Sequence, residues 1–352
     1  MTSPLEVYYA TNYSNCDITY SFLASGKGLA FYCHICQIFA LPFQILAAYI
    51  ILAKTPNVMK SMKTPLLVNH FLWVNCTLLD IQVCTFSTPY ILLRNRSVIC
   101  VGLFSKIGVS NIAQFTTGCF TGIVMLSSYV FIFERRSAHL VGNRFRIRRT
   151  SSKICYYGLL LLINLSVMVY YWYIPSYQET AKIRSLDLEP CPTKEFFTND
   201  VLVIFDDVDV FHFAIRVHFP VVVIHGTLHI LFHVGCTVYY LCIAPSHAIS
   251  VETQKNQRKF LVGITIQTLI PMTLFLIIFC VILMNEIFYG YYQSTMNAAI
   301  VGIAMHGLLE SITLLIVHRP YREAVWKLTM GKGKTRLRFF NRVEPTPICD
   351  PT

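Results

Sequence analysis

Long apolar runs alternate with short polar segments along this chain, and the lengths of the runs indicate the fold class. A membrane-spanning helix needs about 20 apolar residues to cross the hydrocarbon core. Seven runs are long enough; five contain no Lys, Arg, Asp or Glu, and the other two contain one acid each. The pattern predicts seven spans, at residues 29–53, 65–93, 107–133, 154–175, 217–243, 260–284 and 294–317.

Because backbone groups in lipid must be hydrogen-bonded within their own segment, each predicted span is expected to be helical. The sequence therefore indicates an all-α membrane protein, with a seven-transmembrane helix bundle over residues 29–317. Residues 1–28 form a polar N-terminal segment, and residues 318–352 form a basic tail. At the start of the tail, bases alternate with Tyr, Val, Trp and Leu, which predicts a short amphipathic helix along the lipid headgroups.

Composition and charge support this assignment and add an orientation. The 352 residues are 55% hydrophobic and 13% charged, whereas a soluble domain carries about 25% charged residues. Of the 29 Lys and Arg residues, 21 lie after predicted spans 1, 3 and 5 or in the tail. Since such residues accumulate on the cytoplasmic side, we expect an extracellular N-terminus and a cytoplasmic C-terminus. The net charge of +11 then comes from bases that lie beside the lipid bilayer, in the segments between apolar runs. We therefore predict no nucleic-acid partner.

The predicted extracellular segments carry candidate sites for two covalent modifications, a glycan and a disulfide. Asn12-Tyr13-Ser14 is an acceptor sequon for an N-linked glycan on Asn12. Three cysteines, Cys16, Cys100 and Cys191, face the same oxidising compartment, in which disulfides form. We expect a Cys100–Cys191 bond that ties the long loop of residues 176–216 over the outer mouth of the bundle. Because the number of these cysteines is odd, the pairing is not unique.

Two carboxylates lie inside predicted spans, where an ionisable group is costly and is a functional hypothesis by default. Asp80, in the second span, must be protonated or find a partner inside the bundle. It is either a polar node that shifts between two bundle arrangements or a static interhelical hydrogen bond. Glu310 follows His306 by four residues, so these two side chains share one face of the seventh helix and either pair together or join Asp80.

The fifth span carries His218, His225, His229 and His233 at spacings of 7, 4 and 4, which place them on one helical stripe. Two histidines at i and i+4 are able to ligate zinc. No acid accompanies them in this span, so we interpret the stripe as a polar lining of the bundle interior and predict no metal site. From their placement, His225, His229 and Asp80 are the predicted ligand-binding residues.

Phe133-Glu134-Arg135-Arg136 closes the third apolar run on the predicted cytoplasmic side. An acid and two bases follow a charge-free stretch, so the motif marks either the point where the helix leaves the lipid or a place where the bundle rearranges. The chain contains no G-x-S-x-G, H-E-x-x-H, Walker A or Rossmann glycine motif. We therefore predict neither an enzyme nor a cofactor.

Several stretches together resemble the nematode serpentine chemoreceptors, specifically class Srh of the Str superfamily, to which class Sri is a close sister. They are Lys54-Thr55-Pro56…Met59-Lys60…Lys63 with Leu66-Leu67-Val68-Asn69-His70, Thr88-Pro89-Tyr90, Phe133-Glu134-Arg135-Arg136, Pro190-Cys191-Pro192 followed by Phe196-Phe197, and His306-Gly307-Leu308-Leu309 with His318-Arg319-Pro320-Tyr321-Arg322. The chain departs from the family pattern at Arg135, where Asn is usual.

The resemblance implies a G-protein-coupled chemoreceptor of the plasma membrane, in the ciliary membrane of sensory neurons. It would bind an odorant or pheromone and signal to a heterotrimeric G protein, with Glu134, Arg135 and Arg136 as coupling residues. Four bases of the following segment would supply part of a docking face: Arg144, Arg146, Arg148 and Arg149. The rival class is a transporter or ligand-gated ion channel that uses Asp80 and Glu310, but the sequence shows no inverted internal repeat.

Overall fold

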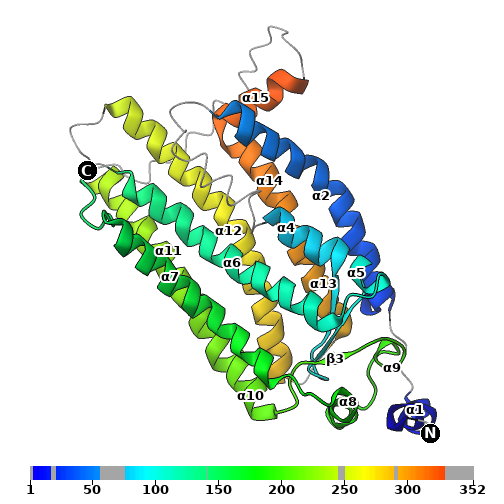
Figure 1. Cartoon of the computed structure of the whole chain (residues 1–352). Helices are drawn as coiled ribbons and strands as arrows, with labels where there is room; N and C mark the ends of the chain where they lie inside the picture. The colour runs from blue at the N-terminus through cyan, green and yellow to red at the C-terminus, as the bar shows by residue number, and fades with distance from the viewer. Residues whose placement is uncertain are drawn as a thin grey trace.

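A computed structural model describes residues 3–16, 21–55, 76–140, 142–244, 250–288 and 292–329, which are mostly helical (Figure 1). The long helices are α2 (Gly26–Lys54), α6 (Asn111–Ala138), α7 (Thr150–Leu165), α11 (Phe219–Val238), α12 (Val251–Phe288), α13 (Gln293–Ala304) and α14 (His306–Val317). They lie side by side in an elongated bundle. A small sheet lies at one end, called here the sheet end, and the helix α15 (Arg319–Thr329) lies at the other, the α15 end.

Irregular helical segments extend several of these helices. The 3₁₀ helix η5 (Ser166–Tyr173) continues α7. Before α11 come α10 (Val208–Phe213) and the π-helical turn η6 (Ala214–His218), and a second π-helical turn, η7 (Tyr239–Ile243), follows it. Among the described residues, six helical stretches are long and apolar enough to span a membrane: 26–54, 111–138, 150–173, 208–243, 251–284 and 293–317. They correspond to the first and the third to seventh predicted spans.

The second predicted span, 65–93, is wrong at its C-terminal end. Its residues 65–75 lie outside the described part of the chain, and the helices α4 (Cys76–Ile81) and η4 (Gln82–Phe86) follow. The strand β1 (Pro89–Leu92) then pairs with the strand β2 (Ser97–Cys100). A short buried strand is as apolar as a span, so the apolar pattern alone does not separate the two.

The third helix begins and ends later than predicted. Ser110 caps the N-terminus of α6 by accepting a hydrogen bond from the backbone N–H of Ala113. The helix then continues through Glu134 and Arg136 to Ala138. These two charged side chains are only 1% and 6% exposed, so they do not mark the point where the helix meets solvent.

Helices far apart in the sequence close the bundle. α6 packs against α7 and α11, whereas α14 packs against α2, α4 and α12. The largest cluster of buried apolar side chains runs across these contacts and includes Ile51, Tyr129, Phe133, Leu160 and Leu314. One core is therefore shared by the first, third, fourth and seventh spans.

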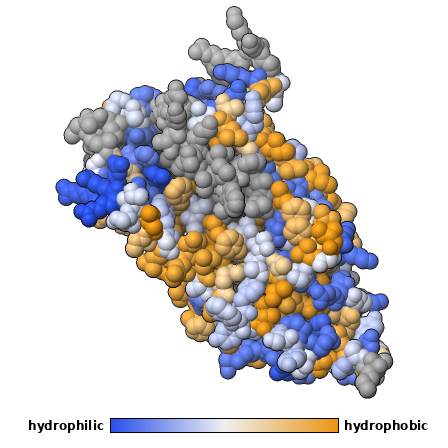
Figure 2. All heavy atoms as spheres, in the orientation of Figure 1, coloured by the Kyte–Doolittle hydropathy of each residue, from blue (hydrophilic) through white to orange (hydrophobic). Residues whose placement is uncertain are grey.

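Large apolar side chains are also exposed on the outside of the bundle, where Phe39 is 63% and Leu162 is 68% exposed. Figure 2 shows apolar residues over the helical part of the visible face and hydrophilic residues toward both ends. Exposed apolar surface of this extent marks contact with a membrane or a partner. Its position around the spans fits lipid.

The sheet end contains structure that the prediction of an all-α fold omits. β1, β2 and β3 (Leu202–Val203) form an antiparallel sheet in that order. The helices α8 (Gln178–Leu186) and α9 (Glu195–Thr198) lie in the same long loop as β3. The fold is thus mostly helical with a small sheet. The prediction missed the sheet because these short strands lack the length and alternation by which a sequence reveals one.

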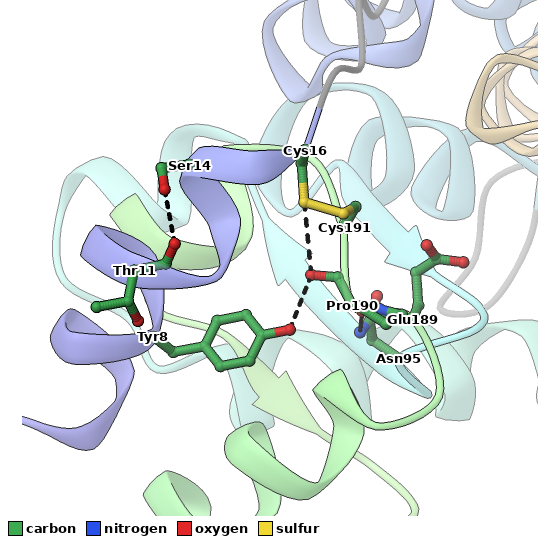
Figure 3. Close-up of a disulfide and its surroundings, with 8 residues drawn as sticks. All are labelled: Tyr8, Thr11, Ser14, Cys16, Asn95, Glu189, Pro190 and Cys191. Atoms are coloured by element: carbon green, nitrogen blue, oxygen red, sulfur yellow. Dashed lines mark hydrogen bonds between the residues drawn. A yellow bond between two sulfur atoms is a disulfide. The ribbon is translucent and has the colours of Figure 1, made fainter.

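The N-terminal helix α1 (Pro4–Thr11) packs on α8 and α9. The hydroxyl of Tyr8 donates a hydrogen bond to the carbonyl oxygen of Pro190 at 3.2 Å (Figure 3). This packing brings Cys16 to Cys191, and the two residues form a disulfide with their Cα atoms 5.8 Å apart. The predicted Cys100–Cys191 bond is therefore wrong. Asn12 is exposed at the end of α1, and its glycosylation stays a prediction.

Cys100 is a free thiol at the end of β2 and is 4% exposed. Its backbone N–H donates to Oδ1 of Asn111 at the start of α6. Burial raises the pKa of the Cys100 thiol to about 12, with a further contribution from Asp200. Since only the thiolate attacks a disulfide, this protonated thiol is unreactive toward exchange with the Cys16–Cys191 bond.

Disulfide mapping by mass spectrometry without reduction should find a peptide pair joined through Cys16 and Cys191. Cys16→Ser should abolish this pair, expose Cys191 to alkylation and cost about 2–5 kcal/mol of stability, because the bond closes a long loop. Cys100→Ser is the matched control and should leave the pair intact. A Cys100–Cys191 peptide pair from the unmodified chain would contradict this pairing.

Candidate functional site

A buried polar cluster lies where α2, α4 and α14 meet. Oδ1 of Asp80 lies 2.7 Å from Nδ1 of His306, and both side chains are fully buried. Oδ2 of Asp80 accepts a hydrogen bond from Nε2 of Gln44 at 2.6 Å. A buried carboxylate requires such partners, because an unpaired buried charge costs far more than a paired one. Asp80 therefore joins three helices through its two oxygens, and we call this cluster the Asp80 cluster.

Glu310 brings a fourth helix to the Asp80 cluster. It lies one turn after His306 on α14, is 0% exposed, and accepts a hydrogen bond from the hydroxyl of Tyr129 on α6 at 3.4 Å. Of the two arrangements that the sequence left open for His306, the structure shows the pair with Asp80. The polar contacts thus run from α2 through α14 to α6.

Gly307 permits this close packing. A Cβ at position 307 would overlap Oδ2 of Asp80 and would lie 2.8 Å from Nε2 of Gln44. Because the surrounding helices are packed, neither group has room to withdraw without breaking the hydrogen bond between them. Glycine at this position is therefore a requirement of the Asp80 cluster.

A second cluster surrounds Glu134 near the α15 end of α6. Oε2 of Glu134 accepts a hydrogen bond from the hydroxyl of Tyr157 on α7 at 2.5 Å. Nη2 of Arg136 donates to the backbone carbonyl oxygen of Gln257 on α12 at 2.9 Å. This Glu134 cluster therefore links α6 to α7 on one side and to α12 on the other.

The same end of α12 is also held by the helix that precedes it. Arg258 donates through Nε and Nη2 to the carbonyl oxygen of Leu241 in η7, at 3.1 and 2.8 Å, and Nε2 of Gln254 donates to that oxygen at 2.8 Å. Side chains that reach backbone carbonyls therefore tie the start of α12 to both α6 and η7. A displacement of α12 has to break or rearrange these hydrogen bonds.

The remaining predicted coupling residues are arranged differently. The guanidinium of Arg135 lies 5.4 Å from the centroid of the Phe131 ring, a cation–π distance, and contributes nothing to the tether on α12. The side chain of Asn143 anchors the α6–α7 segment by donating to the carbonyl oxygen of Ser137 at 2.8 Å. Four bases are exposed on this segment: Arg144, Arg146, Arg148 and Arg149.

The three predicted ligand residues do not lie in one place. Nε2 of His225 and Nε2 of His229 are 3.2 Å apart, and Nδ1 of His229 lies 2.9 Å from the hydroxyl of Tyr156 on α7. Asp80 instead belongs to the cluster between α2, α4 and α14 and is fully buried. The structure thus brings the two histidines together and separates Asp80 from them, and ligand binding by all three stays a prediction.

A groove of about 550 Å³ lies near the sheet end, between η5 and the segment from α10 to α11. Tyr170, Phe213 and Val217 are among its lining residues, together with His218, whose ring nitrogens lie 2.8 Å from the hydroxyls of Ser166 and Tyr170. Its size is in the range of small-molecule sites. Its lining, which combines apolar walls with a few polar groups, is also typical of such sites. The sequence did not single out this groove, because its residues come from two separate segments, 169–173 and 209–221.

The comparisons with known proteins agree with this architecture. The family described as "Serpentine type 7TM GPCR chemoreceptor Srh" matches residues 24–331. The chain belongs to this family. It is also 30% identical to serpentine receptor class H-72 of Caenorhabditis elegans over 323 residues, which cover 90% of each chain. No solved structure matches. The Srh resemblance found in the sequence is thus confirmed, and the chain is a multi-pass membrane protein of a non-enzymatic receptor family.

The sequence alone did not identify several residues that complete these clusters in the Srh-family chain. Gln44 is one amide in an apolar run, which signals a buried polar contact but does not name the partner. Gly307 was visible only as the neighbour of His306. Tyr156 and Tyr157 gave no signal, because aromatic residues are common along this chain and make up 14% of it.

Gly307→Ala should lower the stability of the receptor, because the added methyl group collides with Asp80. We expect a loss of about 1–3 kcal/mol, which is the usual cost of overpacking, and a lower midpoint in a thermal unfolding assay of the detergent-solubilised protein. Gly302→Ala is the control, since a Cβ at Gly302 meets no atom within 4 Å. Equal midpoints for the two variants would show that the Asp80 cluster does not need glycine.

Proposed function

We propose that this Srh-family chain is a chemosensory receptor that binds a small environmental molecule between its helices and signals to a cytoplasmic heterotrimeric G protein. The proposal places the N-terminus and the sheet end outside the cell and the α15 end inside. The excess of Lys and Arg in the segments after spans 1, 3 and 5 and in the tail supports this orientation. So does the Cys16–Cys191 disulfide at the sheet end, because disulfides persist in oxidising compartments.

The observation that carries the proposal is the hydrogen bond from Arg136 on α6 to the carbonyl oxygen of Gln257 on α12. It joins two spans at the end where exposed bases gather. A ligand that acts near the sheet end has to change a contact of this kind for its binding to reach the α15 end. Glu134 and Arg136 are the proposed switch, and Tyr157 restrains it by donating to the Glu134 carboxylate.

The exposed bases beside the switch form the proposed docking face for the G protein. Arg144, Arg146, Arg148 and Arg149 are all exposed on the segment between α6 and α7. Exposed bases of one sign steer an acidic partner toward the surface and accelerate its association. Arg135, stacked near Phe131, is placed at the edge of this face.

For the ligand, we propose a small apolar molecule with one hydrogen-bonding group, bound first in the groove beside His218. The groove is lined mostly by apolar and aromatic side chains, with Asp209 and His218 as the polar exceptions. His218 and His225 are seven residues apart on one helical stripe, so a ligand there lies beside the line of histidines. Asp80 then acts on the bundle arrangement rather than through direct ligand contact.

The contacts do not favour a transporter or a ligand-gated channel. An ion path through Asp80 and Glu310 would need carboxylates that face water. Both are fully buried, Asp80 beside His306 and Gln44, and Glu310 beside Tyr129. We place the receptor in the plasma membrane, in the ciliary membrane of sensory neurons, with an odorant or pheromone as its ligand and with no cofactor.

Arg136→Gln should raise ligand-independent G-protein activation at equal surface expression. A hydrogen bond from a charged group is worth about 1.5–3 kcal/mol, so its loss shifts the equilibrium of α12 by about tenfold or more. The measurement is G-protein dissociation in cells that express each Gα class in turn.

The matched control is Arg135→Gln, which removes the same charge one residue away without touching Gln257. A basal signal no higher than that of the unmodified receptor in every Gα class would contradict the switch. Applying a panel of small odorants to the unmodified receptor, while recording G-protein activation and membrane current, tests the function itself. Current without G-protein activation would favour the channel.

A further inference from the structure

A chain of hydrogen-bonding contacts runs along α11 and crosses to α6. Nε2 of His225 lies 3.2 Å from Nε2 of His229, whose Nδ1 lies 2.9 Å from the hydroxyl of Tyr156. That hydroxyl also lies 3.1 Å from Nε2 of His233, whose Nδ1 lies 3.0 Å from Oγ of Ser137. The side chains of three helices, α11, α7 and α6, thus form one continuous line.

The direction of this chain, meaning which group donates in each hydrogen bond, is determined at its α6 end. Oγ of Ser137 lies 2.9 Å from the backbone carbonyl oxygen of Glu134, and a carbonyl oxygen only accepts hydrogen bonds. The single proton of the Ser137 hydroxyl is therefore donated to Glu134. Oγ of Ser137 must then accept from His233, so the proton of His233 is on Nδ1.

Each following contact is decided in the same way. With its proton on Nδ1, a neutral His233 accepts at Nε2, and the proton of Tyr156 is donated to it. The oxygen of Tyr156 then accepts from Nδ1 of His229, which leaves Nε2 of His229 as an acceptor. His225 therefore donates through Nε2. This assignment uses each proton once and keeps all three imidazoles neutral.

The open end of the chain is Nδ1 of His225. With the proton on Nε2, this nitrogen carries only a lone pair. It is buried and has no hydrogen-bond partner among the described residues. The position of Ser137 on α6 thereby decides that His225, four hydrogen bonds away, offers an acceptor and not a donor.

The same chain converges on the Glu134 cluster. Tyr156 reaches the backbone carbonyl of Glu134 through His233 and Ser137, whereas its neighbour Tyr157 donates to the side chain of Glu134. Two consecutive residues of α7 therefore hold Glu134 at two places. A change in the orientation of the histidines therefore changes the hydrogen bonds of the α6 turn that contains Glu134.

We propose that Ser137 and Tyr156 are positioning residues that make His225 a hydrogen-bond acceptor within the receptor and connect it to Glu134. The specificity that follows is for ligands whose polar group is a hydrogen-bond donor, such as an alcohol. This consequence for the ligand rests on the proposed receptor function. The direction of the chain does not, since it follows from the contacts and from neutral imidazoles.

Imidazole ¹⁵N NMR of the full chain, labelled at histidine and placed in lipid nanodiscs at neutral pH, reads the proton positions directly. Single His→Gln variants assign the signals. We expect protons on Nδ1 of His233 and His229 and on Nε2 of His225. Tyr156→Phe should leave the His233 proton on Nδ1 and give His225 and His229 mixed tautomers. Ser137→Ala should give mixed tautomers at all three histidines.

Two controls separate this effect from a general disturbance of the fold. Tyr157→Phe removes the neighbouring hydroxyl, which bonds Glu134 but lies outside the chain. Ser127→Ala removes another serine of α6, which bonds Asn164 on α7. Both variants should keep the unmodified pattern. A doubly protonated His225, a proton on its Nδ1, or unchanged tautomers in Tyr156→Phe would overturn the proposal. Because the measurement uses neither ligand nor G protein, its result is independent of the test of receptor function.

Discussion

The pairing of Asp80 with His306 is the contact on which the arrangement of the bundle depends. Inside a bilayer, the hydrophobic effect contributes little to the association of helices, because lipid tails are as apolar as leucine. A buried carboxylate is different, since its partners have to be at hydrogen-bonding distance. Asp80 therefore sets the positions of Gln44 on α2 and of His306 on α14 along the bundle axis. Gly307 keeps the space between them free of a side chain.

The two polar clusters restrain the helices in different ways. In the Asp80 cluster, an ionisable pair and an amide are fully enclosed, so separating them would leave buried groups without partners. At the α15 end, α12 is held mainly by arginine and glutamine side chains that reach backbone carbonyls of Gln257 and Leu241. These long side chains are able to exchange one carbonyl for another. The bundle is thus firmly connected through α14 and more adjustable at the start of α12.

The sequence predicted the helical bundle well because lipid allows few alternatives for a long apolar run. It failed where other structures satisfy the same pattern. Pro89–Leu92 belongs to an apolar run that is long enough for a span, but it forms a strand of the small sheet. Glu134 and Arg136 looked like residues at a lipid boundary, yet Tyr157 and the carbonyl of Gln257 give them partners inside the protein.

The functional clusters were predictable in part for a similar reason. Asp80 and Glu310 stood out because an acid in an apolar run is rare, and the histidine stripe stood out because of its spacing. Their partners did not, since Gln44, Tyr129 and Tyr156 come from other helices whose packing no single segment encodes. Cys16 likewise reaches Cys191 only because α1 packs on α8 and α9.

That disulfide also has a consequence for the order of assembly in the membrane. It joins residues 175 positions apart, so the covalent loop that it closes contains α2, α4, α6 and α7 and leaves α11 to α14 outside. The bond forms only after residue 191 has been synthesised and lies on the same side of the membrane as residue 16. The ring is therefore able to close as soon as residue 191 reaches that side, before the helices that carry the histidine stripe and the α12 tethers have been synthesised.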